Sequence, residues 1–170
     1  ADSDTGLSKT MQSFVNSLQD VANDPSSTSS RQTLLAESRN LIARFNSMDQ
    51  RLNELSDEVR SRLSSNADEV TSLGKSLADV NKRIIESGTV SSGNPPPSDL
   101  MDQRDQLLER LSSLVQVQIS EQRDGTTSVF IGSGQVLVLG ADSAKVVVTP
   151  GNADPLQPQV VLRGLGTDVT

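Results

Sequence analysis

The stretch LIARFNSMDQRLNELSDEVRSRLSSNADEVTSLGKSLADVNKRI, residues 41–84, decides the fold of this chain. Its apolar side chains recur at alternating steps of four and three residues, which is the repeat of one face of a long amphipathic helix. No proline interrupts the chain from Ser30 to Glu86, so the pattern predicts a single helix over about 30–86. The predicted seam, which has one polar member, is Leu41, Phe45, Met48, Leu52, Leu55, Val59, Leu63, Asn66, Val70, Leu73, Leu77, Val80 and Ile84.

Two shorter helices are predicted on either side of the long one. The first covers about 4–22, and ANDP at 22–25 ends it, because Pro25 disfavours the helical conformation at Asp24. A serine loop follows, in which Ser29 and Gln32 have the spacing of a capping box. The second short helix begins after three prolines, with Ser98 as its expected N-cap, and covers about 98–114.

The chain changes character near residue 115, where valine and glycine replace the leucine-rich helical pattern. Alternating apolar residues bounded by turn signals predict strands at 115–122, 127–132, 135–140, 145–150 and 159–164. The expected fold is therefore α+β: an elongated antiparallel helical bundle or coiled coil of about three helices, followed by a small antiparallel β meander. We expect a helical rod domain over 1–114 and a β-rich segment over 115–170.

Composition excludes several classes of function. The chain has no histidine and no cysteine, so the commonest acid–base group, the usual zinc ligands and disulfides are absent. Aromatic residues make up 2%, and the net charge is −7, which disfavours nucleic acids and anionic membranes as ligands. No apolar run is long enough to span a membrane. The start of the chain lacks methionine and a leader pattern, and we interpret it as an internal piece of a longer protein.

Asp99, Asp102 and Asp105 form an acidic face on the predicted third helix. Carboxylates in this arrangement suit Mg²⁺ or Ca²⁺, but a magnesium site usually needs a second acidic segment or substrate phosphates. Acidic residues are also stabilised at a helix N-terminus by the macrodipole, and Arg104 and Arg110 lie close enough to offset their charge. We therefore expect structural residues here and no metal.

Two other catalytic hypotheses find little support. A Ser–Lys dyad would need one of Lys9, Lys75, Lys82 or Lys145, all predicted in solvated contexts. The glycines of GSGQVLVLG, residues 132–140, are followed by neither lysine nor a helix, which favours a hairpin turn over a phosphate loop. The sequence predicts no enzyme and no cofactor.

The long seam is the strongest feature of the sequence, and two interpretations of it remain open. It can be the core of an intramolecular bundle, in which case Leu52 and Leu73 are both core residues, whereas Gly74 faces away from the seam. The two flanking helices are together shorter than the long helix, so part of the seam lacks a partner. An uncovered apolar stripe is typical of an interaction surface or of a missing piece of chain, and we favour the missing piece.

Four stretches, taken together, resemble the N-terminal half of the flagellar hook-associated protein 1 family (FlgK), the hook–filament junction proteins. DLMDQRDQLLERLSSLVQV at 99–117 is similar to the family pattern D-L-x-D-x-R-D followed by a strand. FVNSLQDVANDPSSTSSRQTLL at 14–35 resembles its helix, N-x-P, serine-loop and helix segment. LADVNKRI at 77–84 and GSGQVLVLG at 132–140 match two further motifs, in order and at similar spacing.

The resemblance implies a structural, extracellular subunit of the bacterial flagellum that joins hook to filament, exported through the flagellar channel without a cleavable signal peptide. It implies that a C-terminal helix of the full chain packs on the long helix, and that 115–170 begins an outer domain. It implies as partners neighbouring copies of itself, the hook protein and the second junction protein, with no nucleic acid, membrane or small-molecule substrate. The expected structural motif residues are Asp24, Pro25, Asn81, Asp99, Asp102, Arg104 and Asp105.

Charge on the long helix suggests where partners bind. Basic and acidic residues are balanced between Ser30 and Glu86, which is typical of a solvated face. We expect Arg51, Arg60 and Arg62 to contact partners. The alternative is a coiled-coil adaptor or a flagellin-like subunit that binds partner helices through the exposed apolar stripe.

Overall fold

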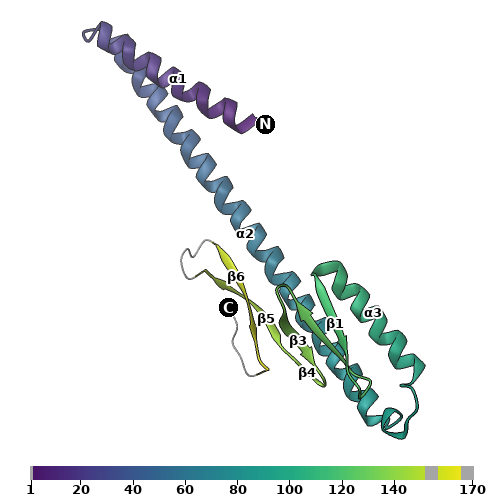
Figure 1. Cartoon of the computed structure of the whole chain (residues 1–170). Coiled ribbons are helices and arrows are strands. Elements are labelled where there is room, and N and C mark those ends of the chain that lie inside the picture. Colours follow the sequence, from purple (N-terminus) through teal and green to yellow (C-terminus); the bar gives the residue numbers. More distant parts are fainter. Residues whose placement is uncertain (1, 152–156, 166–170) are drawn as a thin grey trace. The chain divides into compact units, whose positions relative to one another are not determined.

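The computed structural model describes residues 2–151 and 157–165, and three helices carry its first two-thirds (Figure 1). Helix α1 is Asp2–Asn23, α2 is Thr28–Glu86 with 59 residues, and α3 is Ser98–Leu114. A short 3-10 helix, η1, covers Val90–Ser92 in the loop between α2 and α3. The three predicted helices are confirmed, each to within two residues at either end.

Six strands follow α3 and form two antiparallel sheets. The first sheet has the order β1-β2-β3-β4 and consists of Val117–Glu121, Thr127–Ile131, Gln135–Leu139 and Asp142–Ser143. The second is a two-stranded sheet of β5, Lys145–Pro150, and β6, Pro158–Arg163. The predicted meander is confirmed for the first sheet. Strands β5 and β6 pair with each other in a two-stranded sheet, so Pro150 at the end of β5 and Pro158 at the start of β6 both lie on edge strands.

The chain divides into two compact units, residues 1–58 and 59–170. Helix gives way to strand after Leu114, as predicted, but the strands share a core with the second half of α2 and with α3. The boundary between the compact units therefore falls within α2, and the expected division into a helical rod domain and a β-rich segment at 114/115 stays a prediction. The physical reason for the boundary is that the apolar faces of the sheets pack on the helices of the same unit.

The core of the second unit joins all of its elements. Buried apolar side chains come from α2, from α3 and from both sheets, among them Leu77, Leu111, Leu137, Val138 and Val146. A second, smaller cluster contains Val80, Ile84 and Leu100, with Val90 and Leu107 packed against it. The smaller cluster therefore draws on α2, α3 and η1 alone.

One expectation about α2 is wrong. The sequence pattern predicts that Gly74 faces away from the seam, but Gly74 is buried, and a Cβ placed on it would lie 3.2 Å from Leu137 Cγ. The sequence pattern showed one apolar face on α2. In the structure, a second face is covered because strand β3 packs directly on the helix backbone at Gly74.

The first unit is a helical hairpin of α1 and the first half of α2 (Figure 1). The turn between the helices is held by Asp24, whose carboxylate accepts hydrogen bonds from the backbone N–H and hydroxyl of Ser26 at 3.2 and 2.7 Å. Ser27, and not the predicted Ser29, precedes α2 as its cap, because the Ser30 N–H donates to Ser27 Oγ at 3.2 Å. Helix α1 approaches α2 closely at Gly6, which lies against the guanidinium of Arg44.

The predicted seam is buried along only part of its length. Leu73 is 7% exposed, whereas Leu52 is 62% exposed. The expectation that both are core residues is therefore correct for Leu73 and wrong for Leu52. Both carry the same side chain on the same stripe, but only Leu73 lies where α3 and the sheets cover α2.

Candidate interaction surface

The exposed part of the seam is the main candidate for an interaction surface. In the first unit it consists of Phe45, Leu52 and Leu55, which we call the open stripe, and each is half exposed or more. Val59, the first residue of the second unit, is also exposed. Large apolar side chains at this spacing on one helix are typical of a surface that another helix covers.

Helix α1 does not bury its own apolar stripe completely. Of the apolar residues that recur at steps of three and four along α1, Leu7, Phe14 and Val21 are partly buried, whereas Met11 and Leu18 are about half exposed. The residue that α1 buries fully among those described is Ser17, whose hydroxyl donates to the Phe14 carbonyl at 2.8 Å. Helix α1 therefore leaves part of its apolar surface exposed.

The opposite side of the same hairpin is polar. A shallow groove of about 450 Å³ is lined there by Lys9, Thr10, Ser13, Glu37, Asn40, Ala43 and Arg44. At about 100° per residue, Met11 and Leu18 project from the side of α1 away from Lys9, Thr10 and Ser13. The first unit thus has a polar groove on one side of α1 and exposed apolar side chains on the other.

The three predicted partner-binding arginines lie on the border of the exposed seam. Arg51, Arg60 and Arg62 are all exposed, and neither Arg60 nor Arg62 lacks an interaction partner. At about 100° per residue, Arg51 projects to one side of the Leu52–Leu55 line within the first unit, whereas Arg60 and Arg62 belong to the second unit. Asp49 and Glu58 also flank this line, so the surface around the stripe carries both charges.

The three aspartates of the predicted acidic face on α3 have different environments. Asp99 and Asp102 are exposed at the start of the helix, whereas Asp105 accepts hydrogen bonds from Arg104. Pro97 precedes α3 in the cap position without a side-chain bond, so the expected cap by Ser98 is wrong. Within the described ranges no group of three or more acidic, histidine or cysteine side chains is placed to hold a metal ion.

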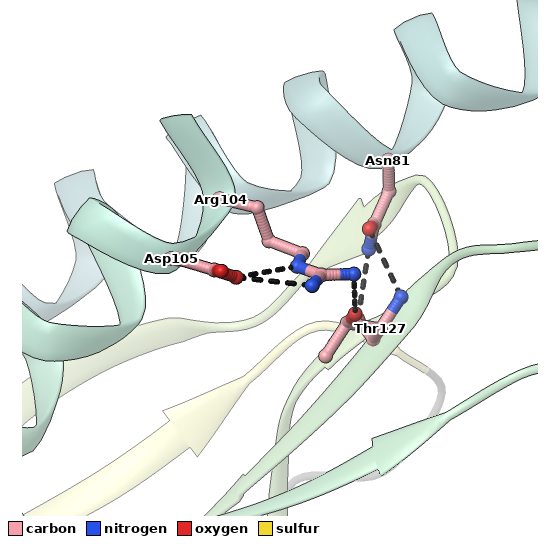
Figure 2. Close-up of polar contacts among 4 residues, drawn as sticks. All are labelled: Asn81, Arg104, Asp105 and Thr127. Atoms are coloured by element: carbon pink, nitrogen blue, oxygen red, sulfur yellow. Dashed lines mark hydrogen bonds and ion pairs between the residues drawn. The ribbon is translucent and has the colours of Figure 1, made fainter. Parts of the chain in front are cut away.

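Asn81 and Arg104 meet at Thr127 of β2, and Figure 2 shows this junction. The Asn81 amide nitrogen donates to the Thr127 carbonyl at 2.8 Å, and the Asn81 amide oxygen accepts from the Thr127 N–H at 3.0 Å. Arg104 Nη1 is 3.4 Å from Thr127 Oγ1, its Nε donates to Asp105 Oδ1 at 3.0 Å, and its Nη2 forms an ion pair with the same oxygen at 3.0 Å. Asn81 and Arg104, both predicted as structural motif residues, therefore bind strand β2, which lies outside the sequence motifs that contain them.

Sequence reasoning missed other contacts of this kind. Thr71 Oγ1 accepts the N–H of Val146 in β5 at 2.9 Å, and Glu69 accepts two hydrogen bonds from Arg110 at 3.1 and 2.8 Å. Arg83 Nη1 donates to Gln103 Oε1 at 3.0 Å, which also joins α2 to α3. A threonine or glutamate in a polar helix gives no sequence signal for such contacts, because its partner lies 40 or more residues away in most of them.

Among the residues that the structure describes, Asp124 in the turn between β1 and β2 has a clearly shifted pKa. Asp124 Oδ1 accepts the Thr126 hydroxyl at 2.6 Å and the Thr126 N–H at 3.0 Å. These two bonds, first that of the hydroxyl and then that of the backbone, lower the pKa of Asp124, and partial desolvation opposes them. The arrangement is that of a turn stabilised by its own side chain.

The described helices include none whose length and apolar character would let it cross a membrane.

Comparison with known proteins identifies the family. A family model described as "Flagellar hook-associated protein FlgK helical domain" matches residues 1–170. "Flagellar hook-associated protein 1" of Salmonella typhimurium is 32% identical over 160 residues, which is 94% of this chain and 29% of that protein.

More distant relatives agree. The protein of the same name from Bacillus subtilis is 29% identical over 142 residues, covering 84% of this chain and 27% of that protein. The solved structure of "the flagellar hook junction protein FlgK from Burkholderia pseudomallei" superposes with a TM-score of 0.84 at 27% identity, over 98% of this chain and 29% of that one. The chain spans less than a third of the length of these relatives. The resemblance seen in the motifs is confirmed: this chain belongs to the FlgK family of flagellar hook-associated proteins, within its helical domain.

Proposed function

We propose that this chain is part of a structural subunit of the bacterial flagellum that joins hook to filament at their junction. The match of the FlgK helical-domain model to all 170 residues supports the proposal, as does the likeness to a protein named for the hook junction. The subunit has no catalytic role and takes no cofactor. A scaffold of long helices with directional polar contacts, rather than a cleft with reactive groups, suits a load-bearing part.

The open stripe is the observation that carries this proposal. Phe45, Leu52 and Leu55 expose apolar surface that water solvates poorly, and covering it with a second helix is favourable by about 25 cal/mol per Å². Because the relatives are more than three times as long as this chain, the full protein has ample sequence to supply such a helix. A helix from elsewhere in the full-length subunit covers the stripe.

The charged borders of the stripe then serve contacts between subunits. Arg51, Arg60 and Arg62 bind neighbouring copies, the hook protein or the second hook–filament junction protein. The β-rich segment 115–170 begins an outer part of the subunit. The subunit acts outside the cell, after export through the flagellar channel, and binds no nucleic acid, membrane or small-molecule substrate.

The test is charge reversal in the full-length protein. Arg60→Glu together with Arg62→Glu leaves the helical circular dichroism unchanged but reduces swimming and filament attachment in a strain that relies on the variant. Lys75→Glu, an exposed charge on the second half of α2, is the matched control and keeps motility. Normal swimming by the double variant would contradict the role of these arginines.

The alternative function, a coiled-coil adaptor or flagellin-like subunit, rests on the same open stripe. An adaptor would use the stripe to form a dimer or to recruit a partner helix. Light scattering after size-exclusion chromatography separates the two functions for the full-length protein. A monomer supports the junction subunit, because its own helix covers the stripe, and a stable dimer that Leu52→Asp dissociates supports the adaptor.

A further inference from the structure

The buried polar residues of this protein gather at one place. Apart from Ser17, the buried polar side chains among the described residues are Asn81, Arg104, Thr126, Thr127 and Ser128. Asn81, Arg104 and Thr127 meet where the first sheet packs on α2 and α3, and Thr126 and Ser128 are the chain neighbours of Thr127. Since burying polar groups is costly unless each is paired, such a concentration constrains how these elements fit together.

Asn81 takes the place of a neighbouring strand. The β2–β3 ladder begins at the Val129–Val138 pair, so Thr127 lies beyond it, and β3 ends at Leu139. The fully buried Asn81 supplies the missing partners: its amide pairs with both the N–H and the carbonyl of Thr127. Its nitrogen also donates to the Gly140 carbonyl at 2.8 Å, in the turn after β3. An asparagine amide has the same donor and acceptor as a peptide group, which suits it to this position.

Arg104 approaches the same residue from the other helix. It is 8% exposed, and its charge is compensated by Asp105, whose own side chain is 64% exposed (Figure 2). Thr127 therefore binds α2 through its backbone groups and α3 through its hydroxyl. Shifting the sheet by one residue along the helices would leave the Asn81 amide of α2 and the Arg104 guanidinium of α3 without their partners on Thr127.

The apolar contacts and the hydrogen bonds constrain this position in different ways. Burial is non-directional and the contact of Leu137 with Gly74 acts through shape, whereas the bonds to Thr127 need a donor and an acceptor in one relative position. The helix pair also has contacts of its own: the Val80–Ile84–Leu100 cluster, the Arg83–Gln103 hydrogen bond and, with a small contribution, the exposed Arg110–Glu69 ion pair. Part of the association of the helices therefore does not depend on the sheet, although Leu111 of α3 also packs in the core that the sheet shares.

We propose that the Asn81–Thr127–Arg104 junction, here called the docking latch, fixes the β1–β4 sheet in one position on α2 and α3. When the latch opens, the sheet detaches as a unit while α2 and α3 stay associated. The latch is closed when the Asn81 amide pairs with Thr127. It opens when the bonds from Asn81 and Arg104 to this edge of the sheet break together.

The first experiment uses the full-length wild-type protein. Hydrogen exchange followed by mass spectrometry, at low concentrations of urea, reports the opening of peptides from β2–β3 and from the facing parts of α2 and α3. The proposal predicts two different opening events. The opening that allows exchange in β2–β3 exposes less surface than the opening that separates the helix pair, and it occurs about tenfold more often or more. A single shared opening for all of these peptides would overturn the proposal.

The second experiment uses Asn81→Leu, which keeps the volume but removes the amide. Exchange in β2–β3 accelerates about tenfold or more, because the Thr127 and Gly140 backbone groups lose their partners, while exchange at Val80–Ile84 and in α3 changes by less than about threefold. Thr71→Val is the matched control: it removes the hydroxyl that accepts from Val146 in β5 and leaves β2–β3 exchange unchanged. Unchanged β2–β3 exchange in Asn81→Leu, or equal acceleration in sheet and helices, would overturn the latch. If Asn81→Leu does not fold, the wild-type measurement alone decides.

Discussion

Gly74 of α2 and Leu137 of β3 are in direct contact, so that a methyl group on Gly74 would lie 3.2 Å from Leu137 Cγ and 3.3 Å from its Cδ1. Leu137 is fully buried in the core of the second unit. The helix backbone itself therefore forms part of the surface on which the sheet packs. Glycine is unfavourable inside a helix, and here this contact explains why it is present.

Gly74→Ala is expected to destabilise the protein although alanine is the better helix former. The gain in helix propensity is about 1 kcal/mol, and overpacking against a buried leucine costs about 1–3 kcal/mol. Urea denaturation measures the difference as a lower midpoint. In a Leu137→Ala background the same substitution becomes neutral or stabilising, because the methyl group then has room. Equal effects in both backgrounds would show that Leu137 is not the cause.

Leu73→Asp and Leu52→Asp test which part of the seam is core. Leu73 is buried, so a charge there costs about 3 kcal/mol or more and lowers the melting temperature. Leu52 is exposed, so in this 170-residue chain the same change leaves the melting temperature nearly unaltered. In the full-length protein, where we propose that a helix covers the stripe, Leu52→Asp becomes destabilising. An equal loss from both variants in the short chain would contradict the exposure of the stripe.

The Arg110–Glu69 ion pair is expected to contribute little to stability. Its closest atoms are 2.8 Å apart, but the arginine side chain is 69% exposed and that of glutamate 36%. Exposed pairs of this kind are typically worth up to about 1 kcal/mol and are screened by salt. A double-mutant cycle with Arg110→Ala and Glu69→Ala measures the coupling, which decreases further when sodium chloride is raised from low to molar concentration. A coupling that is large and independent of salt would contradict this expectation.

Asp124 predicts a pH dependence of the β1–β2 turn. Its pKa is lowered in the folded protein by the hydroxyl and N–H of Thr126. A depressed carboxyl pKa stabilises the fold above the unfolded value of about 3.9, and this contribution is lost as the pH falls through the folded pKa. Asp124→Ala therefore has a lower urea midpoint than the wild type at neutral pH, and the two midpoints converge below about pH 4. A difference that grows towards acid pH would exclude this cause. An NMR titration of the Asp124 carboxyl group checks the direction of the shift directly.

The positions of helices and strands along the chain follow from local sequence. The seam period defines α2, Pro25 and the three prolines before Ser98 separate the helices, and alternating valines mark the strands. These signals act over a few residues, because backbone preference and amphipathic periodicity are local properties. The order and spacing of the motifs along the chain also identified the family.

Tertiary structure decided which parts of α2 are covered and what Asn81 does. Leu52 and Leu73 have the same chemistry on the same stripe, and only the docking of α3 and the sheets makes one a core residue and leaves the other exposed. Gly74 and Asn81 acquire their roles from Leu137 and Thr127, which lie more than 40 residues further along the chain. No local pattern encodes such partners, because burial and hydrogen bonding depend on which distant segments pack together.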